Sequence, residues 1–209
     1  MTTKSLTRRA LSSATAKLGV AAAAGTMAAA LGLAMASSAG ATASRSDSFS
    51  FRLTPAAGIS ACLSHARGEV TITPGRLNDK MRVSVHGLPA RTEFDLFVIQ
   101  TPNKPFGVSW YQTDIHTGGL GNGTAVVRGI FDRETFSVSP GGTTTFAPTH
   151  QYHLGLWFND PNVPFRLGCE PGAPQAIVTP FNGEQHAGIQ VLNTSQFPDD
   201  AGPLSHVHR

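Results

Sequence analysis

Short runs in which apolar and polar residues alternate, separated by Gly, Pro, Asn and Asp, most constrain the fold of this chain. A period of two places every second side chain on the same face of a β-strand, so each run predicts a half-buried strand. No amphipathic helical pattern longer than two turns occurs after residue 43. The runs lie at residues 49–53, 69–73, 81–85, 93–99, 110–116, 124–131, 136–138, 152–158, 177–178 and 188–192.

The connections between these runs favour an all-β domain with antiparallel strands. Asn122-Gly123 stands between two alternating runs, and this dipeptide is a strong hairpin signal. About eight or nine short strands separated by turn signals predict a single β-sandwich over residues 44–209. A small barrel is the alternative architecture.

Two of the runs allow the core face to be named. The expected core side chains are Phe94, Leu96 and Val98 in one run, and Tyr152, Leu154, Leu156 and Phe158 in the other. The opposite face of residues 93–99 changes from charged residues to Phe97 and Ile99. We therefore expect the far end of that second face to be covered as well, because strands buried on both faces lose their alternation.

Two turn motifs carry a resemblance to known folds. Gly87-Leu88-Pro89 joins two alternating runs, and Thr113-Asp114 precedes the Gly-Asn-Gly turn at residues 121–123. Over residues 67–131 this arrangement resembles fibronectin-III-like and immunoglobulin-like extracellular modules, and the whole of residues 44–209 resembles small exported actinobacterial proteins of unassigned role. The resemblance implies a sandwich and no catalytic residue. The antibody-type Cys-Trp-Cys arrangement is not matched.

The first 43 residues have the composition of an export signal. Their basic residues are Lys4, Arg8, Arg9 and Lys17. An uncharged Ala- and Gly-rich stretch follows and ends in Ala41-Thr42-Ala43, which matches an A-x-A cleavage site. Residues 7–11 resemble a twin-arginine signal, with Sec export as the alternative. We expect the export machinery to recognise residues 1–43 and the protein to be secreted or extracytoplasmic; an uncleaved anchor is the alternative.

Removal of the signal leaves a nearly neutral chain. Residues 1–43 hold four of the 16 Lys and Arg residues, whereas all 13 Asp and Glu residues follow. Residues 44–209 therefore carry 12 basic against 13 acidic residues, a net charge of −1. Such a surface lacks the basic footprint of a nucleic-acid-binding protein. No cofactor-binding motif occurs in the sequence, so neither a nucleic-acid partner nor a cofactor is expected.

Cys62 and Cys169 are expected to form a disulfide, because an exported protein with two cysteines most simply pairs them. In the chain-entropy model, closing a loop of roughly a hundred residues stabilises the fold by roughly 4 to 5 kcal/mol, as an upper figure. Two buried thiols are the alternative interpretation.

Four residues are candidate metal ligands, because side chains two apart on a strand share a face. They form the pairs Asp114–His116 and Glu184–His186. Imidazole nitrogen and carboxylate oxygen together suit zinc or copper. The alternative interpretation is a solvated surface, and the end of the chain is expected to be a flexible tail.

Aromatic residues give a second candidate site. Trp110 and Tyr111 are adjacent, and Trp157 follows Leu156 in a run whose other face is core. Alternation would turn Trp157 outward, and amphipathic aromatic side chains on a rigid β-face suit sugars or partner proteins. The alternative interpretation is that the second face is covered and Trp157 is buried.

No Gly-x-Ser-x-Gly elbow or other catalytic motif occurs in the sequence. We therefore expect an exported non-enzymatic protein with a binding or structural role in the cell envelope or extracellular space. Its expected ligand is a protein or a carbohydrate. The alternative is a secreted metal-binding protein or a hydrolase that uses surface His, Asp and Glu residues.

Overall fold

The computed structural model describes residues 48–131, 137–138, 144–145, 150–181 and 184–207, all within the unit Ala43–Arg209. The predicted export signal at residues 1–43 lies outside the described residues and stays a prediction. Among the helices that are described, none is long and apolar enough to cross a membrane.

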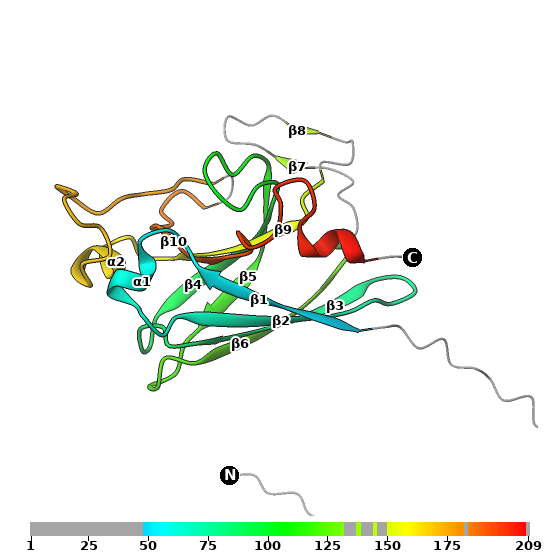
Figure 1. Ribbon diagram of the computed structural model, residues 1–209, viewed down its shortest axis with the longest axis horizontal. Helices are drawn as coiled ribbons and strands as arrows, with labels where there is room; N and C mark the ends of the chain where they lie inside the picture. The colour runs from blue at the N-terminus through cyan, green and yellow to red at the C-terminus, as the bar shows by residue number, and fades with distance from the viewer. Residues whose placement is uncertain (1–47, 132–136, 139–143, 146–149, 182–183, 208–209) are drawn as a thin grey trace, which may run out of the picture. The chain divides into compact units, whose positions relative to one another are not determined.

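The described chain is all-β, as predicted, with eight strands in one antiparallel sheet (Figure 1). Their order across the sheet is β5-β4-β9-β10-β1-β2-β3-β6. The strands are β1 (Phe49–Pro55), β2 (Arg67–Thr73), β3 (Asp79–His86), β4 (Glu93–Ile99), β5 (Ser109–His116), β6 (Gly123–Gly129), β9 (His153–Phe158) and β10 (Gln190–Asn193). The remaining elements are the β7 (Ser137–Val138) and β8 (Thr144–Thr145) pair and the short helices α1 (Ile59–Cys62), α2 (Asn162–Arg166) and η1 (Pro203–His206).

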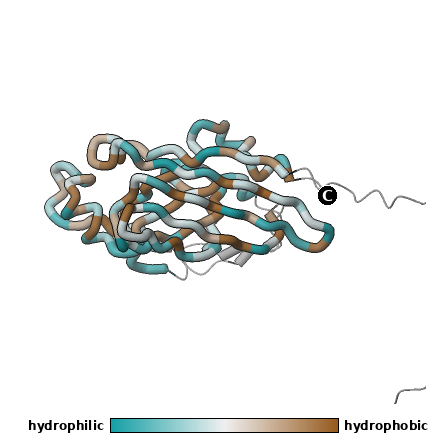
Figure 2. The backbone as a smooth tube through the Cα atoms, turned by 90° about the horizontal axis from the view of Figure 1, so that it is seen from below, coloured by the Kyte–Doolittle hydropathy of each residue, from teal (hydrophilic) through white to brown (hydrophobic). Residues whose placement is uncertain are grey.

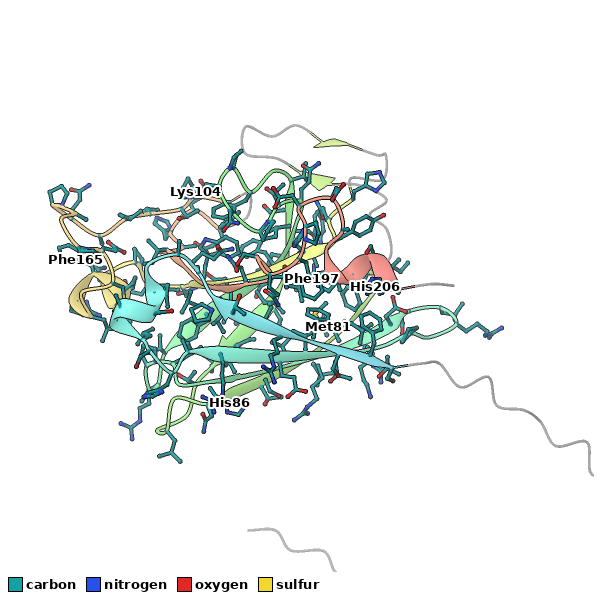
Figure 3. The ribbon with its side chains drawn as sticks, viewed as in Figure 1. Met81, His86, Lys104, Phe165, Phe197 and His206 are labelled. Atoms are coloured by element: carbon teal, nitrogen blue, oxygen red, sulfur yellow. A yellow bond between two sulfur atoms is a disulfide. The ribbon has the colours of Figure 1, made fainter. Side chains whose placement is uncertain are left out.

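The sheet folds over on itself, so that its two halves enclose one apolar core (Figure 1). The first half consists of β1, β2, β3 and β6, and the second half of β4, β5, β9 and β10. Val70 and Val83 from the first half belong to the same buried cluster as Leu96 and Leu156 from the second. Figure 3 shows Met81 lying between the two layers.

The first half has one buried face and one solvated face. In β2 and β3 buried and more exposed residues alternate, and the pairing of Val70 with Val83 places both in the core. Their neighbours Glu69 and Arg82 are exposed. Figure 2 shows the resulting alternation of hydrophilic and hydrophobic residues along the strands. This is the pattern expected of an antiparallel sheet with one wet face.

In the second half, the central strands β4 and β9 are buried on both faces. Every residue of β9 is buried, and in β4 only Glu93 is not. The predicted inward face is confirmed, because Leu154, Leu156 and Phe158 belong to the main core. The outward side chains form a smaller second cluster, whose members are Phe97, Ile99, Trp157, Phe181 and Ala187, with Phe106 packed against it.

Trp157 faces away from the main core, as strand alternation predicts, but it is not in solvent, so the expectation of an exposed aromatic is wrong. Its exposed fraction is 0%, because Phe106 and Phe181 pack against the indole with ring centroids 5.0 and 4.8 Å away. The alternative interpretation, a covered second face, is confirmed. The cover comes from two connections outside the sheet, which an alternation within one strand cannot reveal.

Gly155 makes room for this indole in the middle of β9. A Cβ atom at this position would lie 2.3 Å from a carbon of the Trp157 ring, closer than real contacts allow. The ring therefore lies over the backbone of its own strand, and glycine is the residue that permits so close an approach.

The predicted disulfide between Cys62 and Cys169 is confirmed, with the two Cα atoms 5.1 Å apart. Cys62 ends α1, which follows β1, and Cys169 follows α2, which comes after β9. The bridge thus links a connection of the first half to a connection of the second.

Two segments differ from the sequence predictions. Residues 177–178 form no strand, and both side chains are exposed between Pro174 and Pro180, residues that cannot donate to a ladder. The chain end before residue 208 packs on the core instead of extending as a tail, since Leu204 and Val207 are buried. The Leu204 N–H donates to the Tyr152 carbonyl at 3.1 Å.

Candidate functional site

A pocket of about 480 Å³ lies beside the disulfide and is the first candidate site. Four segments line it: residues 56–58 after β1, residues 103–106 between β4 and β5, residues 169–179 after α2, and residues 189–190 at the start of β10. Its volume falls within the range of about 300 to 1,000 Å³ that is typical of small-molecule sites. The site is assembled from segments far apart in the sequence.

Backbone hydrogen bonds hold two of these segments in place. In the β4–β5 connection, the Thr101 N–H bonds to the Phe106 carbonyl at 3.1 Å, which brings Phe106 against Trp157. In the third segment, the Thr179 N–H donates to the Ala187 carbonyl at 2.7 Å. The connections that carry Phe106 and Thr179 therefore both line the pocket and cover the outer face of β4 and β9.

Three residues that line the pocket carry polar atoms without a partner. The Glu170 Oε2 atom accepts a hydrogen bond from the Ile177 N–H at 2.9 Å, but its Oε1 atom has no partner among the described residues. The same holds for Thr179 Oγ1 and Gln190 Nε2. Buried polar groups are normally hydrogen-bonded, so three such atoms in the lining residues of one pocket are unusual, although each atom is itself shielded from water in the structure.

The apolar part of the lining consists mostly of small and aliphatic side chains, with Phe106 as its aromatic member. Lys104 and Asn103 add polar groups from the β4–β5 connection, and Figure 3 shows where Lys104 lies on that connection. Among the described residues that line the pocket there is no histidine or serine, and Cys169 is in the disulfide.

A second candidate is a group of polar side chains on the outer face of β4 and β5, here named the β4–β5 cluster: Glu93, Asp95, Asp114 and His116. Glu93 pairs with His116 across the two strands, and Asp95 pairs with Asp114. The His116 Nδ1 atom is 3.8 Å from Glu93 Oε2. Ligand atoms of Glu93, Asp114 and His116 all lie within 4.8 Å of one another.

A β-bulge brings a tyrosine to the same face. Thr113 pairs with Leu96 and Tyr111 pairs with Phe97, so Gln112 is an extra residue in β5. Because of this insertion, Tyr111 and Asp114 share a face although they are three residues apart. The Tyr111 hydroxyl donates to Asp114 Oδ1 at 2.8 Å and orients that carboxylate.

Asp95 is the buried member of the cluster, with an exposed fraction of 1%. Burial raises the pKa of its carboxyl to about 7, and the negative charges of Glu184 and Asp114 act in the same direction. The Asn159 side-chain amide opposes this rise by donating to Asp95 Oδ1 at 3.0 Å. The Asp95 Oδ2 atom has no hydrogen-bond partner among the described residues.

The structure brings together only part of the predicted metal-ligand set. Asp114 and His116 share a face as expected, but the third member of their group is Glu93, which sequence reasoning missed. Glu184 is close enough to influence Asp95, and its Oε1 atom accepts from the His186 N–H at 2.6 Å. The His186 side chain does not join the group that the described residues form.

The predicted aromatic site is not assembled. Trp110 is half-buried and packs against the main core, Tyr111 is 43% exposed on the opposite face of β5, and Trp157 is buried in the second cluster. Alternation along β5 sends the adjacent Trp110 and Tyr111 to opposite faces. The three side chains therefore offer no common surface for a sugar or a partner protein.

Comparison of the sequence with models of known protein families and with curated proteins found no match. The functional interpretation therefore rests on the geometry of the pocket and of the β4–β5 cluster.

Proposed function

We propose that this is an exported, non-enzymatic binding protein whose pocket beside the disulfide holds a small amphipathic molecule. The observation that carries the proposal is a largely apolar pocket whose lining residues Glu170, Thr179 and Gln190 each hold a polar atom without a partner among the described residues. Apolar walls supply affinity by burying ligand surface, and a few polar groups set orientation.

The polar groups suggest the chemistry of the ligand. The free Glu170 Oε1 atom accepts hydrogen bonds, so it suits a hydroxyl or amine on the ligand. Gln190 Nε2 donates, so it suits a carbonyl or ether oxygen. A molecule with an apolar body and both kinds of group therefore fits this lining better than a polysaccharide, which would need an exposed aromatic platform.

Export is supported by the confirmed disulfide, since disulfides form and persist in oxidising compartments. The signal-like residues 1–43 supply the route. Intact mass measurement of the exported protein checks cleavage after Ala43, and a secreted product that retains residues 1–43 would contradict it.

Nile red, a neutral amphipathic dye, tests the pocket in the full-length protein with its disulfide intact. We expect saturable binding of one dye per chain, seen as a rise in fluorescence. Ala57 is exposed and lines the pocket, so Ala57→Trp should fill the space without disturbing the core and should weaken binding at least about tenfold.

The matched control is Leu77→Trp, which places the same side chain at a position that is 74% exposed and outside the lining. This variant should bind the dye as the parent protein does. Equal loss of binding in both variants, or the absence of saturable binding in the parent protein, would contradict the proposal.

A further inference from the structure

We propose that Glu93, Asp114 and His116 form a binding site for a divalent transition-metal ion, with zinc as the best fit. Each of the three offers one ligand atom, and these atoms lie within 4.8 Å of one another. Two ligands on one zinc ion can be at most about 4.2 Å apart, because each bond is about 2.0 to 2.2 Å long. The three side chains must therefore approach one another by less than the length of a bond.

The side chains that must move are free to do so. The His116 side chain is 69% exposed and that of Glu93 is 40% exposed, and their mutual contact of 3.8 Å is a loose one. The third ligand is already oriented, because the Tyr111 hydroxyl holds the Asp114 carboxylate. Such a partner behind a ligand is a usual feature of metal sites, where it fixes the geometry of the coordinating group.

The buried Asp95 is a second, independent sign of a cation at this place. Its carboxylate is paired with Asp114 across the strands and is 1% exposed, yet Oδ2 has no hydrogen-bond partner among the described residues. A divalent cation held by Asp114 and Glu93 would place a positive charge beside this buried oxygen.

The mixture of ligands points to the class of ion. Calcium and magnesium prefer sites made of oxygen atoms alone. The imidazole nitrogen of His116 combined with two carboxylates suits zinc and its first-row neighbours. Neither Glu93, Asp114 nor His116 lines the pocket, so the metal site does not depend on the proposed small-molecule ligand.

Isothermal titration calorimetry with zinc chloride tests the site on the full-length protein, purified without a histidine tag and with its disulfide intact. We expect one saturable zinc ion per chain. His116→Gln and Glu93→Gln should each weaken zinc binding by more than about 10-fold, because loss of a partner behind a ligand alone costs about 10- to 100-fold. Both side chains are largely outside the core, so these variants should fold, which circular dichroism checks.

The matched controls are His65→Gln and Glu69→Gln, which remove an exposed histidine and an exposed glutamate elsewhere in the chain. They should bind zinc as the parent protein does, and Ala57→Trp should do so as well. The proposal is overturned if the parent binds no zinc up to about 0.1 mM. It is also overturned if His116→Gln binds zinc as tightly as His65→Gln, or if calcium binds more tightly than zinc.

Discussion

The two halves of the sheet bury their core faces in the same way but differ on their outer faces. The first half presents charged and polar residues to solvent, such as Arg52, Glu69 and Arg82. The second half carries Phe97, Ile99 and Trp157 on its outer face and covers them with Phe106 and Phe181. Figure 2 shows the hydrophilic residues that interrupt the hydrophobic ones along the solvated strands.

The difference between the two outer faces shows where a small β-domain can form a binding site. A solvated face leaves its polar side chains surrounded by water, which lowers their effect on one another. The cover of the second half excludes water from Phe97 and Trp157, and both candidate sites involve that half. The pocket includes Phe106 and Gln190, and Asp95 of the β4–β5 cluster is buried.

The largest effect is expected for a residue of the covered face. Trp157→Ala should lower the free energy of unfolding by about 3 to 5 kcal/mol, as much as Leu156→Ala on the core face at about 2 to 5 kcal/mol. On the first half, Val126 is 53% exposed on β6, so Val126→Ala should cost less than about 1 kcal/mol. Denaturant titrations measure all three. If Trp157→Ala resembled Val126→Ala, the two outer faces would not differ.

A smaller loss of stability is expected when Gly155, which lies beneath the Trp157 ring, gains a side chain. Gly155→Ala places a methyl group 2.3 Å from the Trp157 ring and should cost about 1 to 3 kcal/mol, the range for overpacking. Gly119→Ala is the control, because nothing lies within 4 Å of a Cβ there. Thermal unfolding compares the two variants. Equal melting temperatures would show that the indole does not lie over the β9 backbone.

The smallest effect is expected in the pH dependence of stability. His153 lies on the covered face of β9 with an exposed fraction of 0%, and burial lowers its pKa below the usual 6.5. Its Nδ1 atom is 2.9 Å from Thr194 Oγ1, and Nε2 is 3.0 Å from the Pro198 carbonyl. As the pH falls below 6.5, the unfolded chain gains a proton before the folded one, so the folded state loses stability until the lowered pKa is reached.

Denaturant midpoints measured from about pH 8 to about pH 5 check this contribution. The Asp95 carboxyl, whose pKa is raised to about 7, adds to the stability of the folded state as the pH falls over the same range, so the His153 contribution is measured as a difference between variants. From about pH 8 to about pH 5, His153→Gln should lose less stability, or gain more, than the parent protein. His86→Gln, the same substitution on the outer face of the first half, where Figure 3 shows His86, is the control for the substitution itself. An equal change of stability in His153→Gln and in the parent protein would contradict the prediction.

Much of the fold could be predicted because strand alternation depends only on neighbouring residues and because the chain has only two cysteines to pair. Alternation identifies the strands and the inward side chains of β9, since the strand period depends only on neighbouring residues. The apolar Phe97 and Ile99 indicated that the second face of β4 is covered, and the disulfide followed from there being two cysteines in a chain expected to be exported. The finer resemblance to fibronectin-III-like modules stays a prediction.

The candidate sites could be predicted only in part. Asp114 and His116 share a face by strand alternation, but their neighbour Glu93 depends on which strand pairs with β5. Had the pairing of residues 93–99 with 110–116 been assumed, Glu93 would have been found. For the pocket residues Glu170, Thr179 and Gln190, no local pattern in the sequence marks their polar atoms as unpartnered.

Period, composition and the number of cysteines were enough to predict the all-β class, the inward faces of the strands and the cysteine pair. They did not reveal what covers Trp157, where the bulge at Gln112 turns Tyr111 toward Asp114, or which distant segments line the pocket. The reason is that a strand's alternation specifies two faces without specifying their surroundings. Those surroundings come from connections such as residues 103–106 and 169–181, whose packing is set by contacts far away in the chain.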